Sequence, residues 1–196
     1  MGSESLVPQR TGIVRRNEAL AVSKDERRLR FEALVLPHLD AAHNLARWLS
    51  RDSDVAQEVV QEAFLRAYRS FDTLRGDAKP WLLAIVRNCH RSLVQQRGRR
   101  SYVSLAEEGG ETEVLVADGS DPETDAIRAD HARKLDTVIA TIPVEFREAL
   151  ILREVEDLSY REIADVTGVP IGTVMSRLAR ARALLREKWR YEHELQ

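Results

Sequence analysis

The sequence predicts an all-α protein: two small helical domains, with a helix-turn-helix in the C-terminal one, joined by a flexible acidic linker. Apolar residues recur at helical spacing in both halves of the chain, and neither half shows the alternating pattern of a strand. Between them, residues 105–130 hold nine acidic residues, one arginine, three glycines and a proline. We therefore expect a flexible leader at 1–24, helical domains at 25–101 and 131–196, and a linker at 102–130.

Charge is distributed unevenly along the 196 residues. The whole chain has a net charge of −2, but the acidic stretch alone carries −8, which leaves +6 for the rest. The net charge argues only against a uniformly basic nucleic-acid coat. Local basic stretches on either side of the acidic connection, such as residues 159–190 with a charge of +4, are compatible with nucleic-acid binding.

Several classes of protein are disfavoured. The longest apolar run, Trp81 to Val86, is too short to cross a membrane, and the N-terminus does not resemble a secretory signal. Cys89 is the only cysteine, and the five histidines lack metal-ligand spacing. We expect a cytoplasmic protein without a cofactor, a metal or catalytic residues.

The N-terminal domain is expected to contain three main helices. The first runs from Phe31 to Leu49, and Pro37 is expected to bend or restart it. The second begins at a capping box formed by Asp54 and Gln57. That second helix is expected to end near Phe71.

A loop at 72–79 then leads into the third helix, which begins at Pro80 and extends to about Gln96. Gly98 is expected to stop it, because glycine is a poor helix former.

The C-terminal domain is expected to contain four short helices. Their apolar stripes cover Leu135 to Ile142, Phe146 to Leu152, Ser159 to Val166 and Ile171 to about Tyr191.

The third and fourth of these form a helix-turn-helix pattern. Ser159 and Glu162 have the spacing of a capping box, Gly168 suits a tight turn, and Pro170 precedes the next helix. This combination favours a DNA-binding unit.

The last helix has the pattern of a recognition helix. With Val174 at the centre of its buried face, Leu178 and Ala181 lie beside it, and the opposite face is small, polar and basic. Small side chains with arginine and serine donors let a helix enter the major groove. The alternative is an ordinary solvated face over a small core.

The third helix of the N-terminal domain carries a second basic patch, with five arginines and no acid between Arg87 and Arg100. One side of it could follow a DNA backbone. Phe71, Thr73 and Trp81 flank the loop before it, where an unpaired base could stack, although Phe71 and Trp81 are more commonly core residues.

Four ordered blocks resemble the bacterial sigma factors of the extracytoplasmic-function class. They are Asp54 to Tyr68, Phe71 to Asp77, Trp81 to Asn88, and Leu158 to Asp165 followed by Gly172 to Ala181. The resemblance implies a promoter-melting domain, sigma region 2, and a domain that reads the upstream promoter element, sigma region 4.

The resemblance also implies residue roles. The clamp helices of the largest subunit of core RNA polymerase would be bound by Asp54, Gln57, Glu58, Gln61, Glu62, Phe64 and Arg66. The downstream promoter element, −10, would be held by Phe71, Asp72, Thr73, Arg75, Lys79, Arg87, Asn88, Arg91 and Arg97. The upstream element, −35, would be read by Arg153, Thr173, Met175, Ser176, Arg177, Ala179 and Arg180.

Two positions depart from the family pattern. The family often has a basic residue where this chain has Met175 and a larger one at Ala179, so the preferred −35 bases are expected to differ.

The resemblance implies three partners, which are core RNA polymerase, promoter DNA and a membrane-anchored anti-sigma factor, and a free chain that is a monomer. A self-sufficient helix-turn-helix regulator, usually dimeric, and a sigma mimic that only sequesters an anti-sigma factor remain alternatives. An enzyme is the weakest hypothesis, because no nucleophile-base pattern, phosphate-binding loop or metal cluster is present in the sequence.

Overall fold

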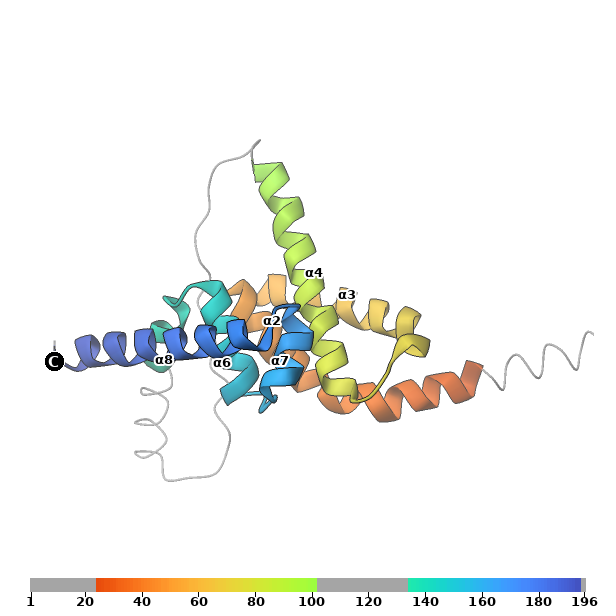
Figure 1. Ribbon diagram of the computed structural model, residues 1–196. Helices are drawn as coiled ribbons and strands as arrows, with labels where there is room; N and C mark the ends of the chain where they lie inside the picture. The colour runs from red at the N-terminus through yellow and green to blue at the C-terminus, as the bar shows by residue number, and fades with distance from the viewer. Residues whose placement is uncertain (1–23, 102–133, 195–196) are drawn as a thin grey trace, which may run out of the picture. The chain divides into compact units, whose positions relative to one another are not determined.

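The computed structural model describes residues 24–101 and 134–194, and this part of the chain contains helices and turns but no strand (Figure 1). Contacts divide the chain after Pro37. In the first unit, residues 24–35 are helical. The second unit holds the candidate sites. The all-α prediction is confirmed; the linker at 102–130 and nearly all of the leader at 1–24 lie outside the described residues, so the domain boundaries stay predictions.

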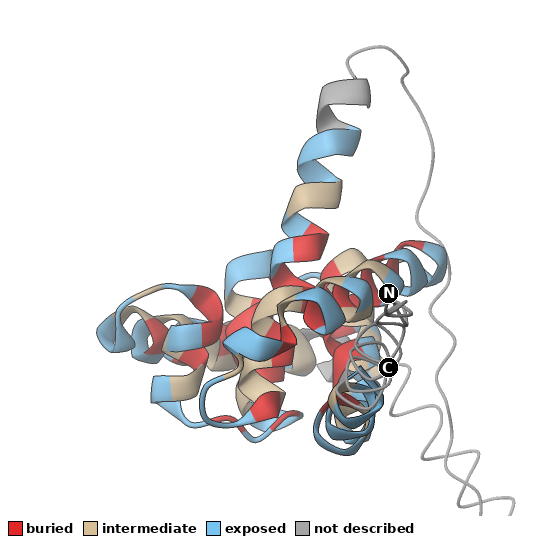
Figure 2. Ribbon diagram, turned by 90° about the vertical axis from the view of Figure 1, so that its right-hand side faces the viewer, coloured by how far each residue is buried: buried red, intermediate tan, exposed pale blue. Residues whose placement is uncertain are grey.

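The N-terminal helices of the second unit are α2 (Leu39–Ser50), α3 (Ser53–Ser70) and α4 (Ala78–Ser101), and each packs on the other two. Apolar side chains such as Leu45, Val59 and Leu83 have almost no exposed surface. Figure 2 colours the buried residues of the ribbon red. Each fully buried leucine or valine contributes about 1.5–3 kcal/mol to the free energy of unfolding.

Several predicted helix ends differ from the structure, among them the start of α4, which is Ala78 rather than Pro80. The side chain of Asp52, rather than Asp54, caps α3 by accepting a hydrogen bond of 2.9 Å from the Val55 amide. α4 continues through Gly98 to Ser101. A glycine inside a helix costs only about 1 kcal/mol, so it does not stop a helix by itself. The predicted restart at Pro37 is confirmed, because this residue lies in the 3-10 turn η1 (Leu36–His38) and the α-helix α2 begins at Leu39.

The C-terminal helices are a helical stretch at residues 134–140, then α6 (Val144–Glu154), α7 (Tyr160–Thr167) and α8 (Ile171–Glu194). α8 packs on both α6 and α7. Ile142, Leu150 and Ala181 form a buried cluster there, with Phe146, Leu184 and Leu185 packed against it. All four predicted helices are present.

The helix-turn-helix geometry matches its sequence signals. Ser159 Oγ accepts from the Glu162 amide at 3.2 Å, while the Glu162 carboxylate accepts from the Ser159 amide at 2.7 Å. Gly168 has φ of 67°, in the left-handed region that favours glycine, and its amide donates to the Ala164 carbonyl at 2.8 Å. The capping box and the turn therefore fix where α7 begins and ends.

The two groups of helices also contact each other within the second unit, α4 against α7 and α2 against α6. These contacts are relevant to the candidate sites, because α4 carries most of the residues expected to hold the −10 element. No helix among residues 24–101 and 134–194 has the length and apolar character of a membrane span.

Candidate nucleic-acid interface

The N-terminal half of α8 presents a face suited to a DNA groove. Val174, Leu178 and Ala181 are buried at 1%, 1% and 0% exposure, as the helical wheel predicts. On the outer side, Met175, Ser176, Ala179 and Arg180 are exposed, and Thr173 and Arg177 are half-buried. A seam of apolar residues thus fixes the rotation of α8, and short or basic side chains face outward.

Arg153 is held at the edge of this face by three partners. Its guanidinium donates to the Leu158 carbonyl at 2.8 Å, lies 3.7 Å from Asp157, and has Cζ 5.7 Å from the centre of the Tyr160 ring. The residues at and just before the start of α7 therefore fix the orientation of the Arg153 guanidinium, which holds its positive charge in one place.

Glu154, which sequence reasoning did not single out, joins this edge beside Arg182, which the helical wheel places at an edge of the outer face. Glu154 accepts two hydrogen bonds from Arg182, at 3.1 and 2.6 Å. The bond from Glu154, and then one from Tyr160, raise the pKa of Arg182. Glu154 and Arg182 are 28 residues apart, so neither helical periodicity nor motif spacing connects them.

The exposed part of the expected −10 surface lies on α4 and the loop before it. Asn88, Arg91 and Arg97 are exposed on α4, whose C-terminal part extends beyond the other helices in both views (Figures 1 and 2). In the loop, Arg75 donates to the carbonyls of Asp72 and Leu74 at 2.9 Å each. Those bonds hold the loop in one arrangement. Asp72, Thr73 and Arg75 are exposed there.

Three residues of the expected −10 surface are not freely accessible. Phe71 is only 5% exposed and is part of the core. Arg87 is buried in an ion pair with Glu148, and Lys79 is half-buried beside Glu156. In this arrangement none of the three presents its functional group to a nucleic acid.

The face expected to bind polymerase lies on α3. Its exposed members are Asp54, Gln57, Glu58 and Gln61, whereas Glu62, Phe64 and Arg66 are half-buried. Glu62 pairs with Arg66 at 2.6 Å, and this bond raises the pKa of Arg66. The face is thus a mixture of amide and paired charged groups over an apolar seam, as is common at protein interfaces.

A cleft of about 370 Å³ lies between α3 and α4, beside the face expected to bind polymerase. Glu58, Gln61, Glu62 and Arg66 line it together with Cys89, whose thiol pKa is raised by burial. Across α3 and α4, Arg97 donates to Glu58 at 2.9 Å. One residue expected to contact DNA and one expected to contact polymerase are therefore bonded to each other.

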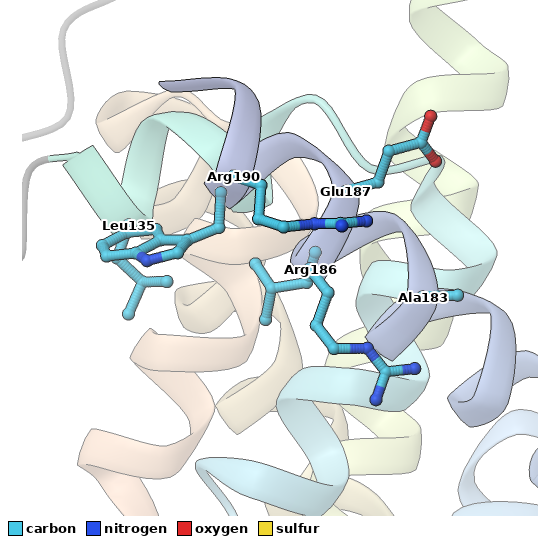
Figure 3. Close-up of a pocket in the computed structure, with 7 residues that line it drawn as sticks. Leu135, Ala183, Arg186, Glu187 and Arg190 are labelled. Carbon is cyan, nitrogen blue, oxygen red and sulfur yellow. The ribbon is translucent and has the colours of Figure 1, made fainter. Parts of the chain in front are cut away.

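A larger groove of about 870 Å³ lies along the C-terminal half of α8 (Figure 3). Its lining combines the apolar side chains of Leu135, Leu185 and Trp189 with the charged side chains of Arg186 and Arg190. No nucleophile paired with a base lines it. In the described residues, no group of three or more His, Cys, Asp and Glu could hold a metal ion.

The chain matches two family models. The model described as Sigma-70 region 2 covers residues 34–100, and the one described as Sigma-70, region 4 covers residues 132–185. The first match contains α3 and α4, and the second contains α6, α7 and the N-terminal part of α8.

Individual relatives agree with these matches. The chain is 37% identical over 158 residues to the RNA polymerase sigma-H factor of Pseudomonas aeruginosa, covering 78% of this chain and 82% of the relative. It is 35% identical over 150 residues to the ECF RNA polymerase sigma-E factor of Haemophilus influenzae, covering 74% and 78%.

A solved structure is also similar. The sigma factor RpoE of Bartonella quintana, solved in complex with the anti-sigma factor NepR, superposes with a TM-score of 0.69 at 28% identity. The match covers 81% of this chain and 95% of that one.

Proposed function

Because the chain belongs to the extracytoplasmic-function class of RNA polymerase sigma factors, we propose that α3 binds core polymerase, α4 and its preceding loop capture the −10 element, and α8 reads the −35 element. Sigma factors are initiation specificity subunits and not enzymes. The chain therefore acts by binding, and the free energy for opening promoter DNA comes from holding unpaired bases.

One observation carries the assignment of α8. Its exposed face consists of Ser176, Ala179 and Arg180 beside Thr173 and Arg177, over the buried seam of Val174, Leu178 and Ala181. Large side chains on that face would hold the helix away from base edges, whereas these allow close approach and supply donors. Arg153 adds a cation at the rim, fixed by Tyr160 and the Leu158 carbonyl.

The −10 surface is supported by the exposed positions Asp72, Thr73, Arg75, Asn88, Arg91 and Arg97. Arg91 and Asn88 lie about one turn apart on α4 and could follow one strand. Phe71 is better assigned to the core, where its burial positions the loop rather than stacking a base.

The proposed polymerase contact uses the amide and acidic face of α3. Glu58 and Gln61 border the cleft between α3 and α4, so a helix of the largest subunit could lie along this border. Polar groups at such an interface mainly set orientation and partner choice.

We further propose that the chain is held inactive by an anti-sigma factor, since the similar Bartonella quintana sigma factor was solved bound to one. The proposed site of action is the cytoplasm, where polymerase and promoter DNA are found. The free chain is proposed to be a monomer.

Reconstitution with purified core polymerase tests the function. We expect the chain to direct transcription from a promoter that core alone cannot open, and to bind duplex DNA only weakly without core. Tight, dimeric binding to duplex DNA with no affinity for core would instead favour a self-sufficient regulator.

The α3 surface can be tested separately. Changing Gln57→Ala and Gln61→Ala together is expected to weaken core binding about tenfold, because both amides lie on the exposed face. Gln95→Ala removes a likewise exposed amide from α4 and serves as the control. Equal core affinity of both variants would remove α3 from the interface.

A further inference from the structure

Two acidic side chains of the C-terminal helices bind cations of the expected −10 surface. Glu148 Oε1 on α6 accepts from Arg87 Nε on α4 at 2.5 Å, and the two side chains are only 7% and 11% exposed. Glu156, just after α6, lies 3.1 Å from Lys79 Nζ and is 4% exposed on its side chain. These two ion pairs join the two groups of helices through charge.

Glu156 is held from a second direction as well. Lys79 Nζ donates to its backbone carbonyl at 2.8 Å, and Asn44 of α2 donates to its carboxylate at 3.5 Å. The carboxylate is thus buried between α2 and the start of α4, with partners from both. Buried carboxylates are tolerated only when partners of this kind are present.

A buried ion pair gives little net stability, because desolvation offsets most of the attraction, but it penalises alternatives in which one charge loses its partner. Separation of α6 from α4 carries no such penalty if water solvates the carboxylates and water or a DNA phosphate pairs with the cations. The pairs therefore favour one packed arrangement without making it permanent.

We propose that Glu148 and Glu156 form a latch that holds the C-terminal helices on α4 in the free chain and occupies Arg87 and Lys79, so that the latch opens before the −10 element is held. The two carboxylates stand where DNA phosphates would otherwise pair with these cations. The inference rests on the proposed function for the assignment of Lys79 and Arg87 to the −10 surface.

The latch is tested by neutralising both carboxylates in the full chain, Glu148→Gln with Glu156→Gln, which keeps side-chain size. Dyes on cysteines introduced by Arg69→Cys on α3 and Glu187→Cys on α8, in a Cys89→Ala background, report the distance between the helix groups by energy transfer. We expect the fraction of molecules with separated groups to rise at least about tenfold. The matched control is Glu145→Gln, which removes an exposed charge from the same helix and leaves the distance unchanged.

A charge exchange separates pairing from simple loss of a residue. Arg87→Glu alone places two acids together and is expected to separate the groups, whereas Arg87→Glu with Glu148→Arg is expected to restore the packed state. If the neutral variant loses helical content, Lys79→Gln opens the latch from its half-buried side instead. Unchanged energy transfer in folded Lys79→Gln and in the neutral variant would overturn the proposal.

Promoter-dependent transcription with core polymerase, measured on the same proteins, keeps the two claims apart. Failure of the wild type to initiate would count against the proposed function, whatever the dyes report. A wild type that initiates, and a neutral variant that stays packed, would count against the latch alone.

Discussion

Arg180 is the exposed cation nearest the centre of the proposed reading face of α8. Arg180→Ala is expected to weaken use of the −35 element by about 1–3 kcal/mol, because an arginine bound to a base edge contributes that much discrimination. Transcription from promoters that differ only in the −35 sequence measures the effect. Arg69→Ala, an exposed arginine of α3, is the control for loss of charge. An equal loss on every promoter would make Arg180 a phosphate contact.

His90 makes the free energy of unfolding depend on pH. Burial, and then the nearby positive charge of Arg147, lower the pKa of His90. Between this lowered pKa and the ordinary value of about 6.5, the unfolded chain therefore binds more protons than the folded chain. Stability is fully present above that pH and is lost as the pH falls from it toward the lowered pKa of the folded state.

Urea unfolding between pH 5 and 8 measures this dependence, and His90→Gln is expected to reduce its slope because glutamine does not titrate. An identical slope for the variant and the wild type would assign the pH dependence to other groups.

The burial of some individual residues could be predicted from the sequence, and that of others could not. The exposed and buried sides of α8 follow from its apolar spacing, so Val174 and Arg180 are placed correctly from the sequence. Arg87 looks like a DNA contact in the sequence, yet it is buried against Glu148, 61 residues away. Only the packing of α4 near α6 brings these charges together.

Among the helices, α7 begins at a capping box formed by Ser159 and Glu162. Ser159→Ala removes the acceptor for the Glu162 amide and is expected to lower the free energy of unfolding by about 1 kcal/mol. Urea unfolding checks the value, with exposed Ser53→Ala on α3 as the control. Equal midpoints for the two variants would show that the cap contributes little.

Gly168 tests the turn between α7 and α8. A Cβ added there meets no atom within 4 Å, so Gly168→Ala is penalised only by its φ of 67°, by about 1–2 kcal/mol. Gly168→Asn is expected to cost less, because asparagine tolerates this conformation better. The comparison is made by thermal unfolding, and an alanine variant as stable as the asparagine one would contradict the backbone explanation.

Element boundaries were predictable where a specific capping signal was present. Ser159, Glu162 and Gly168 place α7 to the residue. The predicted start of α3 at Asp54 is wrong. Asp52 and Asp54 are both good N-cap residues, and the cap is the one whose own backbone is extended, which is Asp52. The predicted end of α4 near Gln96 is wrong, because a glycine such as Gly98 costs a helix only about 1 kcal/mol.

In the whole molecule, the two groups of helices are proposed to have different roles. The N-terminal group is proposed to bind polymerase and to separate the strands, and the C-terminal group is proposed to select the promoter. Composition and periodicity predicted both groups and the all-α class. They could not predict that the groups contact each other in the free chain, because contacts of α4 with α7 depend on tertiary packing.

Permanganate probing of unpaired thymines, on a promoter bound by core polymerase and the chain, tests this assignment of roles most directly. We expect the wild type to make the −10 thymines reactive. Arg91→Ala is expected to keep promoter occupancy but to lower thymine reactivity. Arg180→Ala is expected to lower promoter occupancy, while the promoters that are occupied remain open. Unreactive thymines with the wild type, or the same step lost in both variants, would contradict this assignment of roles.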